Sequence, residues 1–407
     1  MTVSSASPTL QRVLKGELCS GCGLCAGVAP DAVTMGTSTP GYSRPVQSAS
    51  LSDRQEQLIA HSCPGAKIAP WQGAPHQDIS WGPWRQVLTG HALDPEVRFA
   101  GSSGGAISAL LVHALESGLV DSVLHIAPSD EHPTRNRLQW SFTREEVIRN
   151  AGSRYAASAP LSRIGEALAG NRRTAFVGKP CDISALRQLA ALDPRVDARF
   201  PLKLSFFCGG LPSHDGADRV VRAMGLSPQD LTSFRYRGNG WPGMARAETA
   251  NGTVREMSYA DSWGAHLSKE VQFRCKICPD AVGGVADIAC ADAWYGDENG
   301  YPSFDEQDGR SLIISRTETG DAMMASALAA GALACAPLAI GEIDLMQPAQ
   351  ARRKRLVVAR TASCRVFGHP VPEMGGLDVA KAARTAKIGE QIRNFLGMLR
   401  RIVQKRK

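Results

Sequence analysis

Short apolar runs alternate with amphipathic stretches through the middle of the chain, from Trp81 to about Leu345. The apolar runs predict buried strands, over residues 122–127, 174–178, 203–207 and 311–315. Stretches with apolar residues at helical spacing predict helices, over residues 104–117, 162–168 and 183–191. Because strands and helices alternate, we expect an α/β fold with some α+β character, in which helices pack on a sheet.

One part of this region has a different pattern. Residues 244–249 and 253–257 flank Asn251-Gly252. An Asn-Gly pair suits a tight type I′ turn, so we predict a β-hairpin inserted in the α/β core.

The two ends of the chain differ from the middle. Residues 1–18 read as a flexible arm, and residues 19–75 hold too few apolar runs to bury a core of their own. Residues 346–407 form a basic extension with apolar residues at helical spacing, namely Ile388, Ile392, Phe395, Leu396, Leu399, Ile402 and Val403. We expect a C-terminal helix that packs on the core; the alternative is a docking helix for a partner or a peripheral contact with an anionic membrane. The core itself is expected over residues 81–345.

Composition narrows the class of protein. The chain has 407 residues, of which 43% are hydrophobic and 21% charged, and this balance is typical of a folded globular protein. The net charge of +7 is too small an excess to indicate nucleic-acid binding. No apolar run reaches the ~20 residues of a membrane-spanning helix, and the N-terminus lacks a secretory apolar core, so we expect a cytoplasmic protein.

Three of the eleven cysteines follow one another closely, as Cys19, Cys22 and Cys25. The C-x2-C-x2-C spacing is that of a bacterial ferredoxin site, although the position of the next ferredoxin cysteine is Ala29. Cys63, which precedes a proline, supplies a fourth thiol. We therefore predict one [4Fe–4S] cluster in a ferredoxin-like domain over residues 19–75, with a structural zinc site as the alternative.

A second set of cysteines comes from three places in the chain. Cys275 and Cys278 form a C-x2-C pair, while Cys181 and Cys208 each follow a predicted strand. Sites in α/β folds assemble at the carboxyl ends of strands, so we predict that these four thiols hold a second [4Fe–4S] cluster. Cys290 is the competing ligand.

Two glycine-rich segments and a lysine are further candidates. Residues 101–105, Gly-Ser-Ser-Gly-Gly, lead into a predicted helix, where backbone amides suit a phosphate, although such loops are also common turns. The second segment contains Arg237, Gly238, Asn239, Gly240 and Trp241, and reads otherwise as a turn before the hairpin. Lys179 precedes Pro180-Cys181 and offers a cation to a flavin or substrate, unless it is an exposed loop lysine; it is our candidate catalytic residue.

Several segments in order carry a family resemblance: CSGCGLCAGVAPDAVTM, FAGSSGGAISALL, AGSRYAAS, FVGKPCDISALRQL, FFCGGLPS, YRGNGWPG and FRCKICPDAVGGVADIACADAW. The chain resembles the coenzyme F-420 hydrogenase/dehydrogenase beta-subunit family, which includes divinyl chlorophyllide reductase and hydroxymethyl chlorophyll a reductase types. The resemblance implies FAD beside a [4Fe–4S] cluster held by Cys181, Cys208, Cys275 and Cys278. It also implies that Gly101, Ser102, Ser103, Gly104, Gly105 and the segment from Arg237 to Trp241 bind FAD.

Clusters beside a flavin predict an oxidoreductase that couples one-electron transfer to a two-electron reaction. The expected partners are ferredoxin or an electron-transfer subunit, with coenzyme F-420 or another small organic molecule as substrate, and no nucleic acid. The alternatives are a non-catalytic electron-transfer subunit, in one variant serving polysaccharide biosynthesis, and an iron–sulfur structural protein without flavin.

Overall fold

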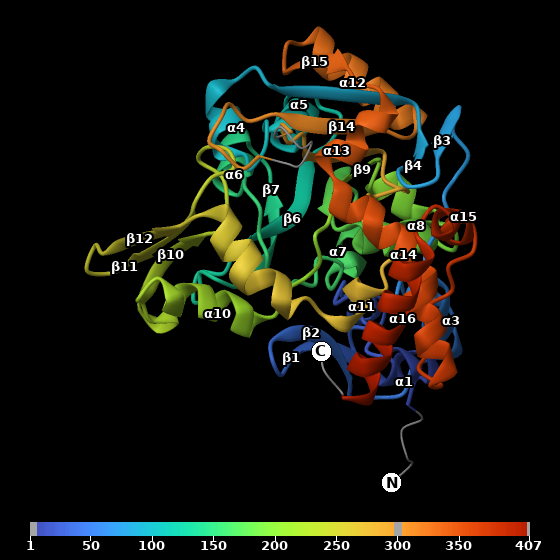
Figure 1. The fold of residues 1–407 in the computed structure, drawn as a ribbon. Coiled ribbons are helices and arrows are strands. Elements are labelled where there is room, and N and C mark those ends of the chain that lie inside the picture. The colour runs from blue at the N-terminus through green and yellow to red at the C-terminus, as the bar shows by residue number, and fades with distance from the viewer. Residues whose placement is uncertain (1–5, 297–302, 405–407) are drawn as a thin grey trace.

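An eight-stranded mixed sheet forms the centre of the molecule in the computed structural model, which describes residues 6–296 and 303–404. The strand order is β15-β5-β14-β13-β9-β8-β6-β7 (Figure 1). The bounds are β5 Gln86–Ala92, β6 Ser122–Pro128, β7 Asn136–Ser141, β8 Thr174–Gly178, β9 Leu202–Phe206, β13 Ile288–Asp292, β14 Ser311–Ser315 and β15 Leu333–Pro337. The predicted strands are confirmed within one residue at each end.

Only the middle of this sheet is parallel. Strands β6, β8, β9 and β13 run parallel, and β7, β14, β5 and β15 pair antiparallel around them. The mixed α/β class is therefore confirmed, and the parallel strands bring their carboxyl ends to one edge of the sheet.

Helices cover both faces of the sheet. On one face, apolar side chains of α4 Pro95–Ala100, α5 Ala106–Glu116, α6 Arg144–Arg149 and α12 Glu318–Ala329 pack on the strands. On the other face lie α7 Ile164–Ala169, α8 Pro180–Ala190 and α9 Arg195–Arg199. Helix α8 begins three residues before the predicted start, with Pro180 in its first turn, where a missing N–H costs nothing.

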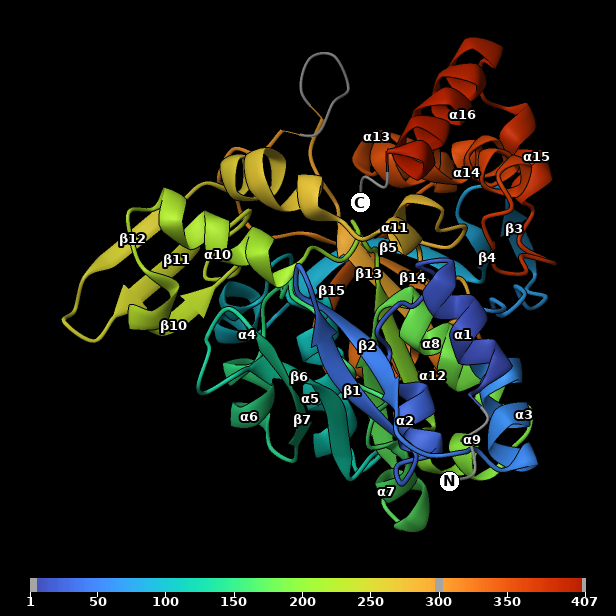
Figure 2. The ribbon, with the colours of Figure 1, turned by 90° about the horizontal axis from the view of Figure 1, so that it is seen from below.

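A three-stranded antiparallel sheet forms a separate lobe beside helix α10, His214–Ala223 (Figure 2). Its strands are β10 Leu231–Arg235, β11 Ala245–Thr249 and β12 Val254–Met257, so the predicted hairpin is confirmed. The type I′ turn is wrong: only Gly252 has a positive φ, and its N–H donates to the carbonyl of Thr249 at 2.9 Å. A type I turn followed by a left-handed glycine is the three-residue alternative for such a connection.

The N-terminal segment contains α1 Pro8–Lys15, α2 Leu24–Val28, the hairpin β1 Val33–Ser38 and β2 Tyr42–Gln47, and α3 Asp53–Ser62. A flexible arm is the wrong interpretation for residues 8–15, because α1 buries Leu10 and Val13 and Ser7 caps its first turn. Residues 1–5 of the predicted arm lie outside the described residues. The domain boundaries themselves stay predictions.

The C-terminal extension is helical throughout most of its length, with α13 Ile343–Met346, α14 Pro348–Val366, α15 Val379–Arg384 and α16 Ile388–Val403 (Figure 1). The remaining elements are short: β3 His76–Asp78, β4 Gly82–Trp84, η1 Pro228–Asp230, η2 Ala260–His266, η3 Leu267–Glu270, α11 Phe273–Lys276 and η4 Ile340–Glu342. None of the described helices combines the length and the hydropathy that a bilayer-spanning helix requires.

Candidate functional site

A deep pocket of about 530 Å³ opens at the edge of the sheet where the parallel strands end. Strand β8 contributes Val177 and Gly178 to its wall, β9 contributes Phe206, and β13 contributes Cys290 and Asp292. Open α/β sheets bind their ligands at this edge, and the volume is that of a pocket for a small molecule or cofactor.

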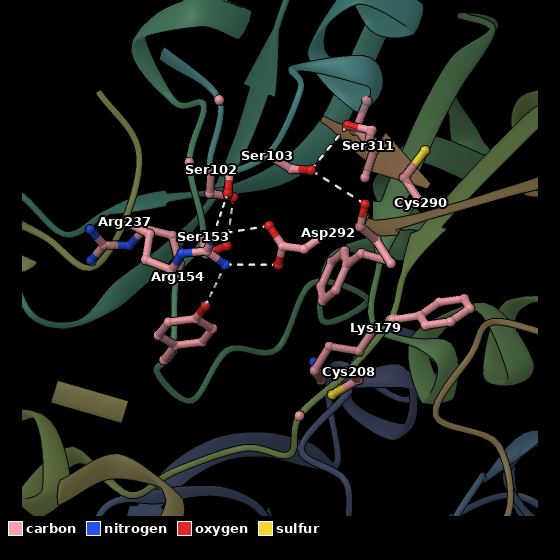
Figure 3. A pocket seen from close by; sticks show the side chains of 18 of the residues that line it. Ser102, Ser103, Ser153, Arg154, Lys179, Cys208, Arg237, Cys290, Asp292 and Ser311 are labelled. Atoms are coloured by element: carbon pink, nitrogen blue, oxygen red, sulfur yellow. Dashed lines mark hydrogen bonds and ion pairs between the residues drawn. The ribbon is translucent and has the colours of Figure 1, made fainter. Parts of the chain in front are cut away.

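The glycine-rich loop between α4 and α5 forms one wall of the pocket. Gly101, Ser102, Ser103 and Gly105 line it, whereas Gly104 lies against the sheet, where a Cβ atom would come within 2.7 Å of the carbonyl oxygen of Gly90. Figure 3 shows Ser103 turned toward Ser311, at 3.1 Å between the hydroxyl oxygens. The loop therefore presents its backbone to the pocket directly before the 11-residue helix α5 begins.

A buried ion pair joins the loop to two other segments (Figure 3). Both terminal nitrogens of Arg237 donate to the carboxylate of Asp292 at 2.9 Å, and one also donates to the carbonyl of Ser102 at 2.6 Å. The Arg237 Nε donates to the carbonyl of Pro242 at 2.8 Å, and the indole N–H of Trp241 reaches Asp292 at 2.8 Å. Burial alone lowers the pKa of Arg237, but the nearby Asp292 carboxylate raises it overall, so the guanidinium keeps its positive charge.

Of the predicted segment from residue 237 to 241, only Arg237 reaches the pocket wall. Trp241 lies behind the wall and stacks on Trp294, with 4.8 Å between ring centroids. Gly238, Asn239 and Gly240 lie outside the lining. The segment therefore supports the pocket through one arginine and one indole.

Lys179 lies inside the pocket and is not an exposed loop lysine. Its ammonium donates to Asp182 at 2.7 Å, and the backbone N–H of Lys179 reaches the same carboxylate oxygen at 3.0 Å. Burial disfavours the charged lysine, yet Asp182 and the neighbouring Cys181 raise the pKa of Lys179 above its ordinary value. The pocket therefore holds a lysine–aspartate ion pair beside a cysteine.

The structure brings the first four cysteines together. Burial raises the pKa of Cys25, and the adjacent thiols of Cys22, Cys19 and Cys63 raise it further. The N–H of Gly21, which has a positive φ of 76°, donates to the sulfur of Cys19 at 3.4 Å. Cys22 lies directly before Gly23, the left-handed residue that begins α2.

The second four cysteines also converge. Burial raises the pKa of Cys208 to about 12, and the neighbouring Cys275 thiol raises it further. The pKa of Cys181 is also raised by burial and, among other groups, by the thiols of Cys208 and Cys275. The N–H of Leu211 donates to the sulfur of Cys275 at 3.4 Å. Burial raises the pKa of Cys278, and the Cys275 thiol adds to this rise. Among these four, Cys208 lines the pocket. We call these sets the first and the second thiol group.

Cys290 stands apart from the second thiol group. Burial raises its pKa, and the thiol that adds to this effect is Cys335. It lines the pocket, but the interactions that connect the second thiol group do not include it.

The surroundings of both thiol groups suit a negatively charged cluster. Arg274 is 3% exposed and donates to the carbonyl of Pro64 at 3.2 Å. Burial raises the pKa values of Cys63 and Cys278, and the Arg274 guanidinium opposes this rise at both thiols. It therefore lies between the two groups. Within the described residues, no three His, Cys, Asp or Glu side chains are close enough to hold one metal ion.

Several of the residues that line the pocket were not identified from the sequence. Gly152, Ser153, Arg154 and Tyr155 line the pocket, and their only signal was the AGSRYAAS segment of the family resemblance. Arg353 from α14 lines it too, and donates to the carbonyl of Cys208 at 3.0 Å. An aromatic side of the pocket comes from residues far apart in the chain, namely Tyr155, Tyr259, Trp263, Trp294 and Phe304.

Fold and site together define a mixed α/β protein with two thiol groups and a cofactor-sized pocket that the second of these groups borders. Two family models match the chain, described as the N-terminal and C-terminal parts of the coenzyme F420 hydrogenase/dehydrogenase beta subunit, over residues 87–164 and 171–340. The chain belongs to this family.

Named relatives agree with this assignment. The coenzyme F420 hydrogenase subunit beta of Methanococcus voltae is 26% identical over 303 residues, which cover 72% of this chain and 100% of the relative. The F420-dependent formate dehydrogenase subunit beta of Methanocaldococcus jannaschii is 24% identical over 56% of this chain and 59% of that protein. A chain in the F420-reducing [NiFe] hydrogenase complex from Methanosarcina barkeri has the same fold, with a TM-score of 0.58, 22% identity, and coverage of 74% of this chain and 98% of that chain. Relatives of this chain are thus named as subunits of F420-linked oxidoreductases.

Proposed function

We propose that this protein is an FAD- and [4Fe–4S]-containing oxidoreductase. It exchanges single electrons with ferredoxin or a partner subunit, and two electrons with coenzyme F-420 or another small organic molecule. The observation that carries the proposal is the position of Cys208, which belongs to the second thiol group and also lines the pocket. A redox group in the pocket would therefore lie next to a redox group on the thiols.

The pocket wall assigns roles to this chain's residues. The backbone of Gly101, Ser102, Ser103 and Gly105 and the N-terminus of α5 would bind the phosphates of FAD, because free amides at a helix start favour anions. Arg237 holds this loop in place through the carbonyl of Ser102. Lys179, held in its ion pair with Asp182, would offer the remaining N–H donors of its ammonium to a group bound in the pocket.

The two thiol groups would each hold one cluster, through Cys19, Cys22, Cys25 and Cys63 and through Cys181, Cys208, Cys275 and Cys278. Clusters supply one-electron chemistry, while a flavin exchanges either one or two electrons. Buried thiols with backbone N–H donors, such as Cys19 and Cys275, fit this use because such hydrogen bonds help set cluster potentials.

A second candidate is an electron-transfer subunit whose substrate is bound by a partner. The names of the relatives favour it, since two of those compared are subunits called beta. In this case the pocket would still hold FAD, but the isolated chain would not turn over an organic substrate.

Anaerobic purification after reconstitution with iron and sulfide tests the proposal. We expect a flavin absorbance band and about eight irons per chain, the sum of two four-iron clusters. Cys278→Ala should lose about half of the iron, whereas Cys335→Ala, which lies in neither thiol group, should retain all of it. Protein that binds iron without flavin would contradict both candidates, and reduction of F-420 by the isolated chain would select the first.

A further inference from the structure

The C-terminal extension lies outside the regions that the family models match, which end at residue 340. Residues 351–407 contain 15 Lys and Arg but only three acidic residues, a net charge of +12 in a chain whose total is +7. All of the excess positive charge is therefore concentrated in this extension. In Figure 1 its helices α14 and α16 lie together on one side of the molecule.

The inner face of α16 packs on the first thiol group. Met398 belongs to the same apolar cluster as Cys19, and both Ile402 and Cys63 pack against that cluster. The hydrogen bond from Arg12 to the carbonyl of Val371, at 2.8 Å, also ties the N-terminal segment to the extension.

A relay of hydrogen bonds connects α16 with the second thiol group. Arg360 on α14 binds the side-chain oxygen of Asn394 on α16 at 2.9 and 3.1 Å. The same guanidinium donates to the carbonyl of Lys276 at 2.8 Å, between Cys275 and Cys278. Helix α16 therefore lies over both thiol groups.

The outer face of α16 carries an apolar stripe. Ile388, Ile392, Leu396 and Val403 are between 54% and 78% exposed. The spacing of the first three is four residues, so they line up along one side of the helix. Arg393 and Arg400 border the stripe, and neither forms an ion pair with an acidic residue in the described part of the chain.

We propose that this stripe with its arginine border is the docking face for an acidic one-electron carrier protein. An apolar centre with a charged rim is the usual anatomy of a protein interface, and the positive rim complements an acidic partner and speeds its association. The inference rests on the proposed electron-transfer function.

A membrane is the competing occupant of such a helix, but the location of the stripe favours a protein. Helix α16 is linked to the first thiol group through the apolar cluster of Met398 and to the second through Asn394 and Arg360. An electron carrier has to approach such groups, whereas a lipid surface does not.

Binding of an acidic [2Fe–2S] ferredoxin to the reconstituted full-length protein tests the inference. The double variant Ile392→Ser/Leu396→Ser should bind it at least tenfold more weakly, and Arg393→Glu/Arg400→Glu should also reduce the salt dependence of binding. The matched control is Leu93→Ser, a 53% exposed apolar residue elsewhere on the surface, which should bind like the unchanged protein. A basic cytochrome c should not bind this face.

The outcomes separate the inference from the proposed function. The inference is overturned if ferredoxin binds equally well to the unchanged protein and to the stripe variant, or if it binds to neither. Stripe-dependent binding to phosphatidylglycerol vesicles without ferredoxin binding assigns the face to a membrane and also overturns it. Iron and flavin content are measured on the same samples, so a protein without these cofactors contradicts the proposed function, while stripe-dependent ferredoxin binding would still support the face.

Discussion

The ion pair between Arg237 and Asp292 should be essential to the shape of the pocket. Arg237 is 2% exposed and joins three segments, since its guanidinium reaches Asp292 on β13, the carbonyl of Ser102 in the glycine loop, and the carbonyl of Pro242. Arg237→Met keeps most of the side-chain volume but removes every one of these hydrogen bonds. It also leaves the carboxylate of Asp292 without its cation.

The size of the effect follows from burial. Breaking a buried ion pair by removing one partner costs about 3–5 kcal/mol. Asp292 is 18% exposed and keeps its hydrogen bond from Trp241, so the lower end applies, about 3 kcal/mol of unfolding free energy. That is a large part of the 5–15 kcal/mol that stabilises a typical domain.

Urea unfolding of four proteins measures the coupling: the unchanged chain, Arg237→Met, Asp292→Leu and the double variant. Each single change leaves the partner's charge unpaired. The double variant should therefore lose about 2 kcal/mol less unfolding free energy than the two single variants lose together. Arg246→Met is the control, because Arg246 is 46% exposed and pairs with Glu256 at 3.3 Å, where a surface pair contributes about 0–1 kcal/mol. Additive costs at positions 237 and 292 would refute the reasoning.

Three further changes test other parts of the site. Burial lowers the pKa of His125 to about 4 from the ordinary ~6.5, so between these two pH values only the unfolded chain binds a proton at this histidine. The unfolding free energy should therefore decrease as the pH falls from about 6.5 to about 4. In urea titrations at several pH values, His125→Gln should show a smaller decrease than the unchanged protein. Gly104→Ala should destabilise the protein and lower its flavin content, because the new methyl group meets backbone atoms at 2.7 and 2.8 Å, whereas Gly73→Ala has open space and should change neither. Arg274→Met removes a buried cation near both thiol groups, so the proposed clusters of the reconstituted protein should be harder to reduce. Their midpoint potentials should be lower in a spectroscopic redox titration, with unchanged potentials as the contrary result.

The strands of the core could be predicted because each one is buried on both faces. Residues 174–178 and 311–315 are short, continuous apolar runs, and β8 and β14 have those bounds. The convergence of the second thiol group could be expected for a related reason, because Cys181 and Cys208 follow parallel strands that end at the same edge. In both cases local sequence and the geometry of a parallel sheet lead to the same arrangement.

Other features depend on contacts between distant segments, which local patterns do not encode. Helix α14 buries Lys354 and Leu356 together with polar residues such as Thr361, because it contacts different neighbours along its length, and this removes a regular apolar stripe. Helix α1 has a clear stripe, but its eight residues are too few to be stable alone and depend on packing against the rest of the N-terminal segment and the extension. The role of Arg353 at the pocket wall follows only from the position of α14.

The parts of the chain outside the family match meet one another at the thiol groups. Val13 and Leu18 from the N-terminal segment share an apolar cluster with Cys364 and Met398 from the extension, and Cys19 lies in the same cluster. The extension in turn reaches the pocket itself, where Arg353 donates to the carbonyl of Cys208. The matched core therefore holds the pocket, while the added segments enclose the first thiol group and contact the second. If electrons pass between a carrier and the pocket, the N-terminal segment and the C-terminal extension both lie on that route. Sequence variation among relatives in these two parts should therefore affect the choice of electron partner more than the chemistry in the pocket.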